Sequence, residues 1–200
     1  DRTPGDGSLA AIHPPRARDI HARAIPHGPD SDFMKLTWII LGALGTADRR
    51  VRIVSPYFLP PEEIIVALQT AALRGVRIQI LVPAQNNLAY VDWAMRANYE
   101  RLLRYGIELA AEPGPFDHAK LFVADDAWAL IGSTNWASRS LRLNVEVNLE
   151  CVSTELAGEL NTVFDTKWAQ AEAFTLAGVQ AWPLPVKLRN RFARLFSPWL

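Results

Sequence analysis

"HAKLFVADDAWALIGSTNW", residues 118–136, holds two short apolar runs separated by the acidic pair "DD". The pair at 125–126 predicts a tight turn, so "HAKLFVA" and "AWALIG" are expected to form a β-hairpin. His118 and Lys120 lie two residues apart, and on a strand two such residues face the same side. The stretch closes with a compact glycine-serine turn at 132–133. It therefore predicts a hairpin that carries an imidazole and an ammonium group side by side.

The segments around this hairpin show the periods of both helices and strands. Strands are predicted at 51–55, 76–83, 107–111 and, after the hairpin, at 144–152. Helices are predicted from a cap at Ser31 or Asp32 to about Thr46, from Pro60-Pro61 to Gly75, over 90–106, and over 154–173. The order begins as β-α-β-α-β and then turns to strands with little room for crossover helices. This pattern predicts an α/β fold in which a mixed β-sheet is sandwiched between helix layers.

Composition limits the classes of protein that the chain can belong to. Two hundred residues suit one domain with a proper core. Lys and Arg number 21 and so do Asp and Glu, so no overall field steers the chain toward nucleic acid. The single cysteine excludes an internal disulfide and a cysteine-based zinc site. No stretch of the sequence is long and apolar enough to predict a membrane span.

Polar side chains repeat along the last predicted strand, "NVEVNLECV". Asn144, Glu146 and Asn148 share one face, while the apolar residues between them face the other way. Burying such a row costs free energy unless its members pair with one another or with a ligand. We therefore expect the row to border a binding site that also includes His118 and Lys120.

These residue types suit phosphoryl transfer. The ammonium group of Lys120 can neutralise non-bridging phosphate oxygens, and Ser133 and Asn135 can donate hydrogen bonds to them. A neutral imidazole at His118 can attack phosphorus, and an imidazolium can protonate a leaving oxygen. A carboxylate such as that of Glu146 can hold the other ring nitrogen and fix the tautomer. The scheme requires no metal and no other cofactor.

The same residues resemble a known family. "HAKLFVAD" matches the H-x-K-x4-D signature of the phospholipase D superfamily, and "GSTN" at 132–135 matches its G-S-x-N. The two patterns at this spacing are much more specific than the first alone. From about residue 28 onward the chain is similar to the C-terminal half of bacterial cardiolipin synthase-type phosphatidyltransferases. The similar stretches include "RIVSPYFLPPEEIIVALQTAALRGVRIQILVP" and "SLRLNVEVNLECVSTELAGEL".

The resemblance implies an active site built from two such motifs. One histidine forms a phosphohistidine, and the other protonates the departing alcohol and activates the incoming one. By this analogy His118 is the general acid and base, Glu146 orients it, and Lys120, Ser133 and Asn135 bind the phosphate. Asp125 completes the motif and is expected among the catalytic residues, although a turn-forming role at the end of the hairpin stays open. The second motif is expected from a missing N-terminal half or from a homodimer mate.

Three segments are expected along the chain. Residues 1–30 are rich in Pro, Gly and charge and resemble a linker, which suggests a chain cut from a longer enzyme. Residues 31–182 form the phospholipase D-like catalytic domain with its one motif. Residues 183–200 form a basic amphipathic tail.

The tail, with Lys187, Arg189, Arg191 and Arg194 around an apolar stripe, has the composition of a helix that lies on anionic lipid. A helix docked on its own domain is the alternative that periodicity leaves open. The lipid resemblance favours the membrane surface. We therefore expect association with the bacterial cell membrane, on its cytoplasmic face.

Three activities fit these residues. The leading hypothesis is a phosphatidyltransferase of cardiolipin synthase type, which moves a phosphatidyl group between glycerol-based alcohols and uses a phosphatidylglycerol-like phospholipid. A phospholipase D that hydrolyses phospholipid headgroups would need the same residues. A homodimeric nuclease of the same superfamily would explain the single motif, but the balanced charge argues against nucleic acid as a partner.

Overall fold

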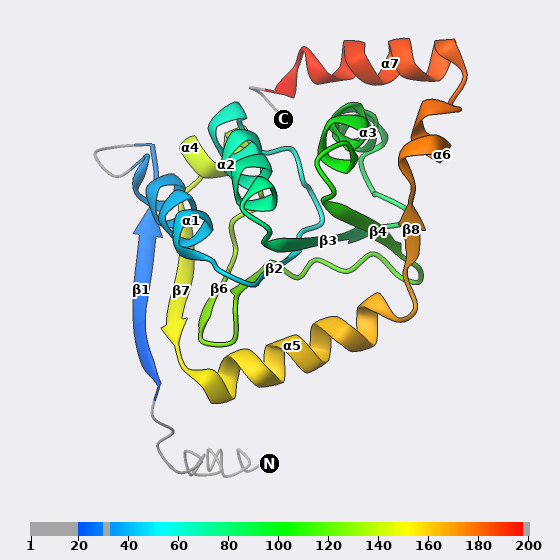
Figure 1. Ribbon diagram of the computed structural model, residues 1–200. Helices are drawn as coiled ribbons and strands as arrows, with labels where there is room; N and C mark the ends of the chain where they lie inside the picture. The colour runs from blue at the N-terminus through cyan, green and yellow to red at the C-terminus, as the bar shows by residue number, and fades with distance from the viewer. Residues whose placement is uncertain (1–19, 30–32, 198–200) are drawn as a thin grey trace, which may run out of the picture.

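A mixed β-sheet organises the computed structural model of the protein, which describes residues 20–29 and 33–197. In this part of the chain the sheet has eight strands in the order β1-β7-β6-β5-β2-β3-β4-β8. Helices lie on both of its faces (Figure 1). The predicted fold class, a mixed sheet between helix layers, is confirmed.

One half of the sheet is parallel. Strands β2 (Arg50–Val54), β3 (Arg77–Pro83) and β4 (Glu108–Glu112) run in one direction. Helices α2 (Glu62–Leu73) and α3 (Ala89–Leu103) connect them. Helix α2 starts after Pro61 and carries two acidic residues in its first turn, where the helix dipole favours negative charge. The chain leaves α2 through Gly75, whose φ of 95° a side chain would oppose.

The other half is antiparallel. Strands β5 (Leu121–Ala124) and β6 (Trp128–Gly132) form the predicted hairpin, and β6 pairs with β7 (Glu146–Val152). The short helix α4 (Ser138–Arg142) connects β6 to β7. Strand β5 also pairs antiparallel with β2, which joins the two halves into one sheet.

The edge strand β1 (His21–His27) differs from the sequence interpretation, which placed these residues in a linker-like segment. It pairs antiparallel with β7 along its whole length. Its Ile25 and His27 are buried while most of its other residues are exposed. Proline and charged residues suit such an edge strand, which explains why the composition resembled a linker. Residues 1–19 and the proposed cap residues Ser31 and Asp32 lie outside the described residues.

The helices form two unequal layers. Helices α1 (Lys35–Thr46), α2 and α3 cover one face, and α5 (Thr154–Trp168) crosses the other (Figure 1). Helix α5 ends five residues before the predicted end at 173, because residues 172–174 form β8, which pairs with β4. Helices α6 (Leu176–Gln180) and α7 (Leu184–Arg194) follow, and α7 packs against α3. No helix among the described residues is long and apolar enough to cross a bilayer.

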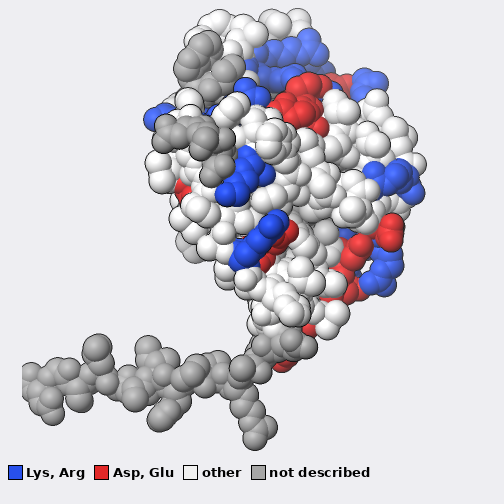
Figure 2. Space-filling view, turned by 90° about the vertical axis from the view of Figure 1, so that its left-hand side faces the viewer, with Lys and Arg blue, Asp and Glu red and all other residues white. Residues whose placement is uncertain are grey.

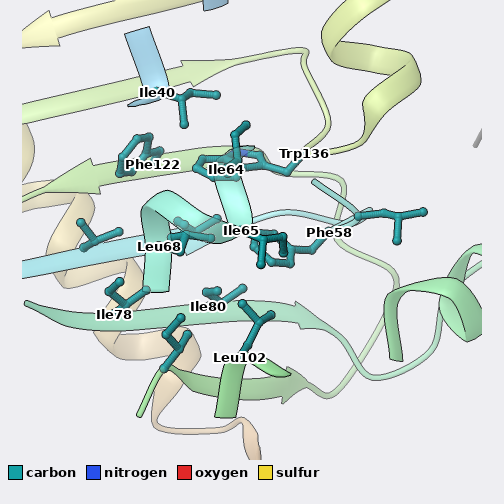
Figure 3. Close-up of a cluster of buried hydrophobic side chains, with 14 of the residues drawn as sticks. Ile40, Phe58, Ile64, Ile65, Leu68, Ile78, Ile80, Leu102, Phe122 and Trp136 are labelled. Atoms are coloured by element: carbon teal, nitrogen blue, oxygen red, sulfur yellow. The ribbon is translucent and has the colours of Figure 1, made fainter. Parts of the chain in front are cut away.

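The larger hydrophobic core lies between the sheet and the helices α1, α2 and α3 (Figure 3). Trp136, which follows "GST", is inserted in it. Its ring lies 5.7 Å from that of Phe58 and 5.2 Å from that of Phe122, measured between centroids. Its backbone carbonyl accepts a hydrogen bond from the N–H of Leu59. The core therefore fixes the loop that carries Ser133 and Asn135.

Candidate active site

Four segments of the chain meet at one edge of the sheet. The start of β5, the end of β6, the start of β7 and the end of β2 are neighbours there, because β5 is antiparallel to both β2 and β6, and β6 is antiparallel to β7. This arrangement brings His118 and Lys120 together with Ser133, Asn135 and Glu146. The separations in sequence between these residues reflect the lengths of the hairpin and of the α4 connection.

Lys120 and His118 are in direct contact. The Lys120 ammonium group lies 2.9 Å from His118 Nδ1 and donates to the His118 backbone oxygen at 2.5 Å. Lys120 is 7% exposed, whereas His118 is open to solvent. Burial lowers the pKa of Lys120 to about 8, against the opposing effect of Glu146 and Asp117. Burial and the neighbouring Lys120 also lower the pKa of His118 below its ordinary value of 6.5.

Glu146 is held by hydroxyl and amide donors. Ser140 Oγ donates to Glu146 Oε1 at 2.7 Å, and Asn144 Nδ2 donates to the same oxygen at 3.2 Å. Burial would raise the pKa of Glu146, but the hydrogen bonds from Ser133, Ser140 and Asn144 outweigh it and lower the pKa. The carboxylate acts on His118 through its charge, while the side chain at His118 Nδ1 is that of Lys120.

The glycine of "GSTN" is required by close packing. A Cβ at Gly132 would lie 2.2 Å from Asn148 Oδ1 and 2.6 Å from the backbone oxygen of Val147. Asn148 is itself fixed, because its Nδ2 donates to Thr134 Oγ1 at 2.7 Å. Ser133 pairs with Val147 through both its backbone and its hydroxyl. The absence of a side chain at 132 therefore lets β7 approach the loop that carries Ser133.

Asn135 carries an unpaired buried atom. Its side-chain oxygen has no hydrogen-bond partner among the described residues, although its backbone N–H donates to Ser140 Oγ at 3.1 Å. Buried polar atoms are almost always paired in folded proteins. The Asn135 side-chain oxygen, like the unpaired Nδ1 of the neighbouring His27, can therefore form a hydrogen bond with a ligand.

Asp125 lies away from this cluster. Asp125 follows β5, whereas His118 and Lys120 precede that strand. Asp125 is five positions after Lys120, which corresponds to roughly 16 Å along the strand. The Asp125 carboxylate accepts hydrogen bonds from the backbone N–H groups of Asp48, Arg49 and Arg50 at 2.8–3.1 Å. Its φ is 52°, a turn conformation that Asp tolerates better than most residues. The side chain thus ties the hairpin turn to the start of β2, and the structural role for Asp125 stays a prediction beside the catalytic one.

Sequence reasoning missed His27. The buried His27 side chain places Nε2 3.1 Å from the Ser140 backbone oxygen, and His27 is the residue of β1 paired with Glu146. His27 stood in a segment that resembled a linker, and no lysine follows it two residues later, so the motif offered no signal. The one available signal was the alternation of "HARAIPH", which places Ile25 and His27 on one face.

Two aromatic rings surround His118. The ring centroids of Tyr57 and Phe116 lie 6.0 and 5.8 Å from that of His118, and 5.9 Å from each other. The Tyr57 hydroxyl donates to Asn87 Oδ1 at 2.6 Å. Tyr57 and Phe58 are adjacent in the sequence. The structure separates them, because Phe58 is fully buried in the core and Tyr57 faces the imidazole.

A cavity of about 220 Å³ adjoins the cluster. Its wall combines aromatic, amide and cationic side chains, among them Tyr57, Tyr90, Asn135, Arg139 and Asn144. Cavities of this kind accept small polar molecules or parts of larger ones. No group of three or more His, Cys, Asp or Glu side chains is arranged to hold a metal ion in the described part of the chain.

The sequence matches a known family over more than half of its length. Residues 40–168 match the family model described as "Cardiolipin synthase, PLD-like domain". The chain belongs to this family. It is 34% identical over 181 residues to cardiolipin synthase A of Pseudomonas putida, and 30% identical over 182 residues to the major cardiolipin synthase of Bacillus subtilis. These matches cover 90% and 91% of this chain but 38% of each relative, so the chain spans little more than a third of their length.

Solved structures show the same fold. A phospholipase D family member from Salmonella typhimurium, Nuc, superposes with a TM-score of 0.66 at 21% identity, over 78% of this chain and 99% of that one. A phosphatidylserine synthase from Haemophilus influenzae superposes with a TM-score of 0.72 at 16% identity, over 90% of this chain and 48% of that one. At these identities the likeness establishes the fold alone.

Proposed function

We propose that this chain supplies one half of the active site of a phosphatidyltransferase of cardiolipin synthase type. The observation that carries the proposal is the contact between Lys120 and His118 beside the Glu146 carboxylate, in a chain of the cardiolipin synthase family. Lys120, Ser133 and Asn135 bind the phosphate of the phospholipid. His118 moves protons, and Glu146 stabilises its charged form through space.

The reaction proceeds in two displacements. A histidine of a second motif attacks phosphorus and forms a P–N bond, while the bond from phosphorus to the donor alcohol breaks and His118 gives its proton to that oxygen. His118, now neutral, takes the proton of the incoming alcohol. The alcohol oxygen then attacks phosphorus, the P–N bond breaks, and the new phosphodiester leaves. The second motif comes from another part of a longer chain or from a second copy.

The lowered pKa of His118 suits the second displacement. A general base must be neutral when the alcohol arrives, and burial beside Lys120 favours the neutral imidazole at neutral pH. The rings of Tyr57 and Phe116 beside His118 exclude water from one side of it. Limited access of water favours transfer to an alcohol over hydrolysis.

The cavity next to Asn135 fits the polyol of the acceptor. Its unpaired amide oxygen can accept a hydrogen bond from a hydroxyl group, and Asn144 and Tyr57 offer further polar contacts in the same wall. Arg139 adds a positive charge that suits an acceptor with a phosphate of its own, such as phosphatidylglycerol. These contacts support a glycerol-based alcohol as the second substrate. The place of the reaction, at the surface of the bacterial membrane and on its cytoplasmic side, is proposed from the family to which the chain belongs.

The test is product analysis. The protein is incubated with phosphatidylglycerol vesicles, and cardiolipin, glycerol and phosphatidic acid are quantified by mass spectrometry. When the second motif is present, in a second copy of this chain or in a longer chain, we expect cardiolipin and glycerol from the wild type and none from His118→Ala. His21→Ala removes an exposed histidine from the edge strand and serves as the matched control with unchanged turnover.

Other products would redirect or refute the proposal. Phosphatidic acid without cardiolipin would mean that water is the acceptor, and cleavage of DNA but not of lipid would favour a nuclease.

The role of His118 has its own test, because a variant can lose the general acid and base and still keep the nucleophile. His118→Ala should slow both displacements yet still form some phosphohistidine with a donor that carries a good leaving group. Complete loss of that intermediate would make His118 the nucleophile instead.

A further inference from the structure

Helix α7 carries its apolar stripe on the side that faces solvent. Leu184, Leu188 and Phe192 recur every four residues and are 67%, 56% and 63% exposed. Leu195 and Phe196 continue this face past the end of the helix and are also exposed. The side turned to the protein is small and polar instead, with Asn190 and Ala193 buried. A docked surface helix ordinarily has the opposite arrangement, so the stripe is available to an apolar partner.

An arginine-lined groove runs beside this stripe, between α3 and α7. It measures about 750 Å³. Its lining includes Arg101 of α3, Arg104 directly after α3, and Arg191 and Arg194 of α7. We call it the arginine groove. Lys and Arg side chains gather in the upper part of the molecule in Figure 2, the end at which α7 lies in Figure 1.

The positive charge of the groove is only partly neutralised. Arg101 donates to Glu62 at 2.7 Å and Arg194 lies 3.7 Å from the same carboxylate, while Arg104 donates to Glu100 at 2.8 Å. The four guanidinium groups therefore face two carboxylates, which leaves two positive charges uncompensated. In the described part of the chain no ion pair of Arg191 is present. Guanidinium groups in such a cluster bind phosphate oxygens well, because each can donate two parallel hydrogen bonds.

We propose that the arginine groove binds the headgroup phosphate of an anionic phospholipid in a bilayer, while the outward stripe of α7 enters the boundary of the acyl chains. An apolar stripe flanked by arginines is the arrangement by which interfacial helices bind anionic membranes. A soluble phosphate compound would use the arginines but would leave the stripe unexplained. The inference rests on the proposed location at the membrane, but not on the catalytic chemistry.

The arginine groove is distinct from the active site. Tyr90 lines the cavity beside the catalytic cluster and Arg101 lines the groove. The two residues are eleven positions apart on α3, which corresponds to roughly 16 Å along the helix axis. Both lie toward the same end of the molecule, because α4 and the start of β7 are in the upper part of Figure 1, the part in which α7 also lies. A bilayer held by α7 and the groove would therefore lie close to the opening of the active site.

The test measures vesicle binding separately from turnover. The protein is floated with vesicles of phosphatidylcholine alone or with added phosphatidylglycerol. The groove variant Arg191→Gln/Arg194→Gln should bind the phosphatidylglycerol vesicles roughly 30-fold more weakly than wild type. The control Arg23→Gln/Arg77→Gln removes two exposed arginines elsewhere, each paired with one glutamate, and should bind within a few-fold of wild type.

The stripe has its own pair of variants. Phe192→Ser should weaken binding roughly tenfold, whereas Leu73→Ser, at an exposed apolar residue of α2, should not. Equal binding by the groove variant and wild type would overturn the proposal. So would equal loss in the groove variant and its charge-matched control, or wild-type binding that does not depend on phosphatidylglycerol. His118→Ala should bind vesicles normally while forming no product. The vesicle-binding result can therefore be interpreted even if the catalytic proposal fails.

Discussion

Lys120→Met should make the protein more stable while removing its activity. Burial lowers the pKa of Lys120 from its ordinary value of 10.5 to about 8, so folding at pH 7 must keep a disfavoured charge inside the structure. A change of this size corresponds to about 3 kcal/mol. Methionine has a similar length and no charge. It forfeits the hydrogen bonds to the His118 backbone oxygen and Nδ1, at about 1 kcal/mol each. We expect a net gain of about 1 kcal/mol in the free energy of unfolding.

The pH dependence identifies the cause. Below pH 8 the lysine is charged in both the folded and the unfolded state, so the penalty is fully present. Between pH 8 and 10.5 only the unfolded state holds the proton, and the stability of the wild type rises with pH relative to the variant. Urea unfolding at pH 7 and at pH 10 measures the free energy of unfolding of the wild type and of the variant at each pH. The advantage of Lys120→Met should disappear or reverse at pH 10.

A second lysine provides the control with the opposite sign. Lys167 is partly buried, but its hydrogen bonds to Asp117 and Glu112 outweigh the effect of burial and raise its pKa. Its contribution to stability is present at pH 7 and is lost as the pH rises through its folded pKa, so Lys167→Met should destabilise the protein at pH 7. The reasoning fails if Lys120→Met is the less stable protein at pH 7, or if its difference from wild type is the same at both pH values.

Three further predictions concern the motif. Gly132→Ala should cost about 2–3 kcal/mol in urea unfolding, because its Cβ would meet Asn148 and the β7 backbone, whereas Gly158→Ala, with open space on α5, should be neutral or stabilising. Asp125→Ala should cost about 2 kcal/mol through the lost hydrogen bonds to three backbone N–H groups, yet leave kcat per folded molecule nearly unchanged; a large fall in kcat would restore a catalytic role. In wild-type kinetics kcat/KM should decline in two stages, first as His118 loses the proton that it gives to the leaving alcohol, and again as the pH rises through about 8, where Lys120 loses the charge that binds phosphate; in an active Lys120→Arg variant only the second decline should be absent.

Local patterns sufficed for the fold class and for the candidate residues that meet at one edge of the sheet. The hairpin at 118–132 followed from two apolar runs around an acidic pair, and the spacing of His118, Lys120, Ser133, Asn135 and Glu146 followed from the motifs. Their convergence depends on strand directions that the hairpin itself sets. The contact partner of each side chain could not be predicted in the same way. That Lys120, rather than Glu146, contacts His118 Nδ1 depends on side-chain positions that no spacing encodes.

The strand β1 shows why the remainder could not be predicted. An edge strand pairs on one side only and exposes most of its residues, so its sequence needs little apolar content and resembles a linker. The buried His27 lies beside Glu146 only because β1 pairs with a strand about 120 residues later in the sequence. The alternation within each segment can indicate which face is buried, but it does not identify the strand with which the segment pairs.

The orientation of helix α7 could not be predicted from its sequence. Periodicity identified the apolar stripe and the basic flanks of the tail, but it left open whether the helix docks on its own domain or lies on a membrane. The structure shows that docking does not use the stripe, because Asn190 and Ala193 face the protein while Leu188 and Phe192 face outward. The two alternatives are therefore compatible: the polar side of α7 attaches it to α3 and leaves the apolar side for lipid. Turning α7 about its axis would bury its three large apolar side chains against the protein in place of an asparagine, which is the orientation expected of a helix whose stripe serves docking. Exposing them to water carries a free-energy cost, and an acyl boundary beside the arginine groove would relieve it.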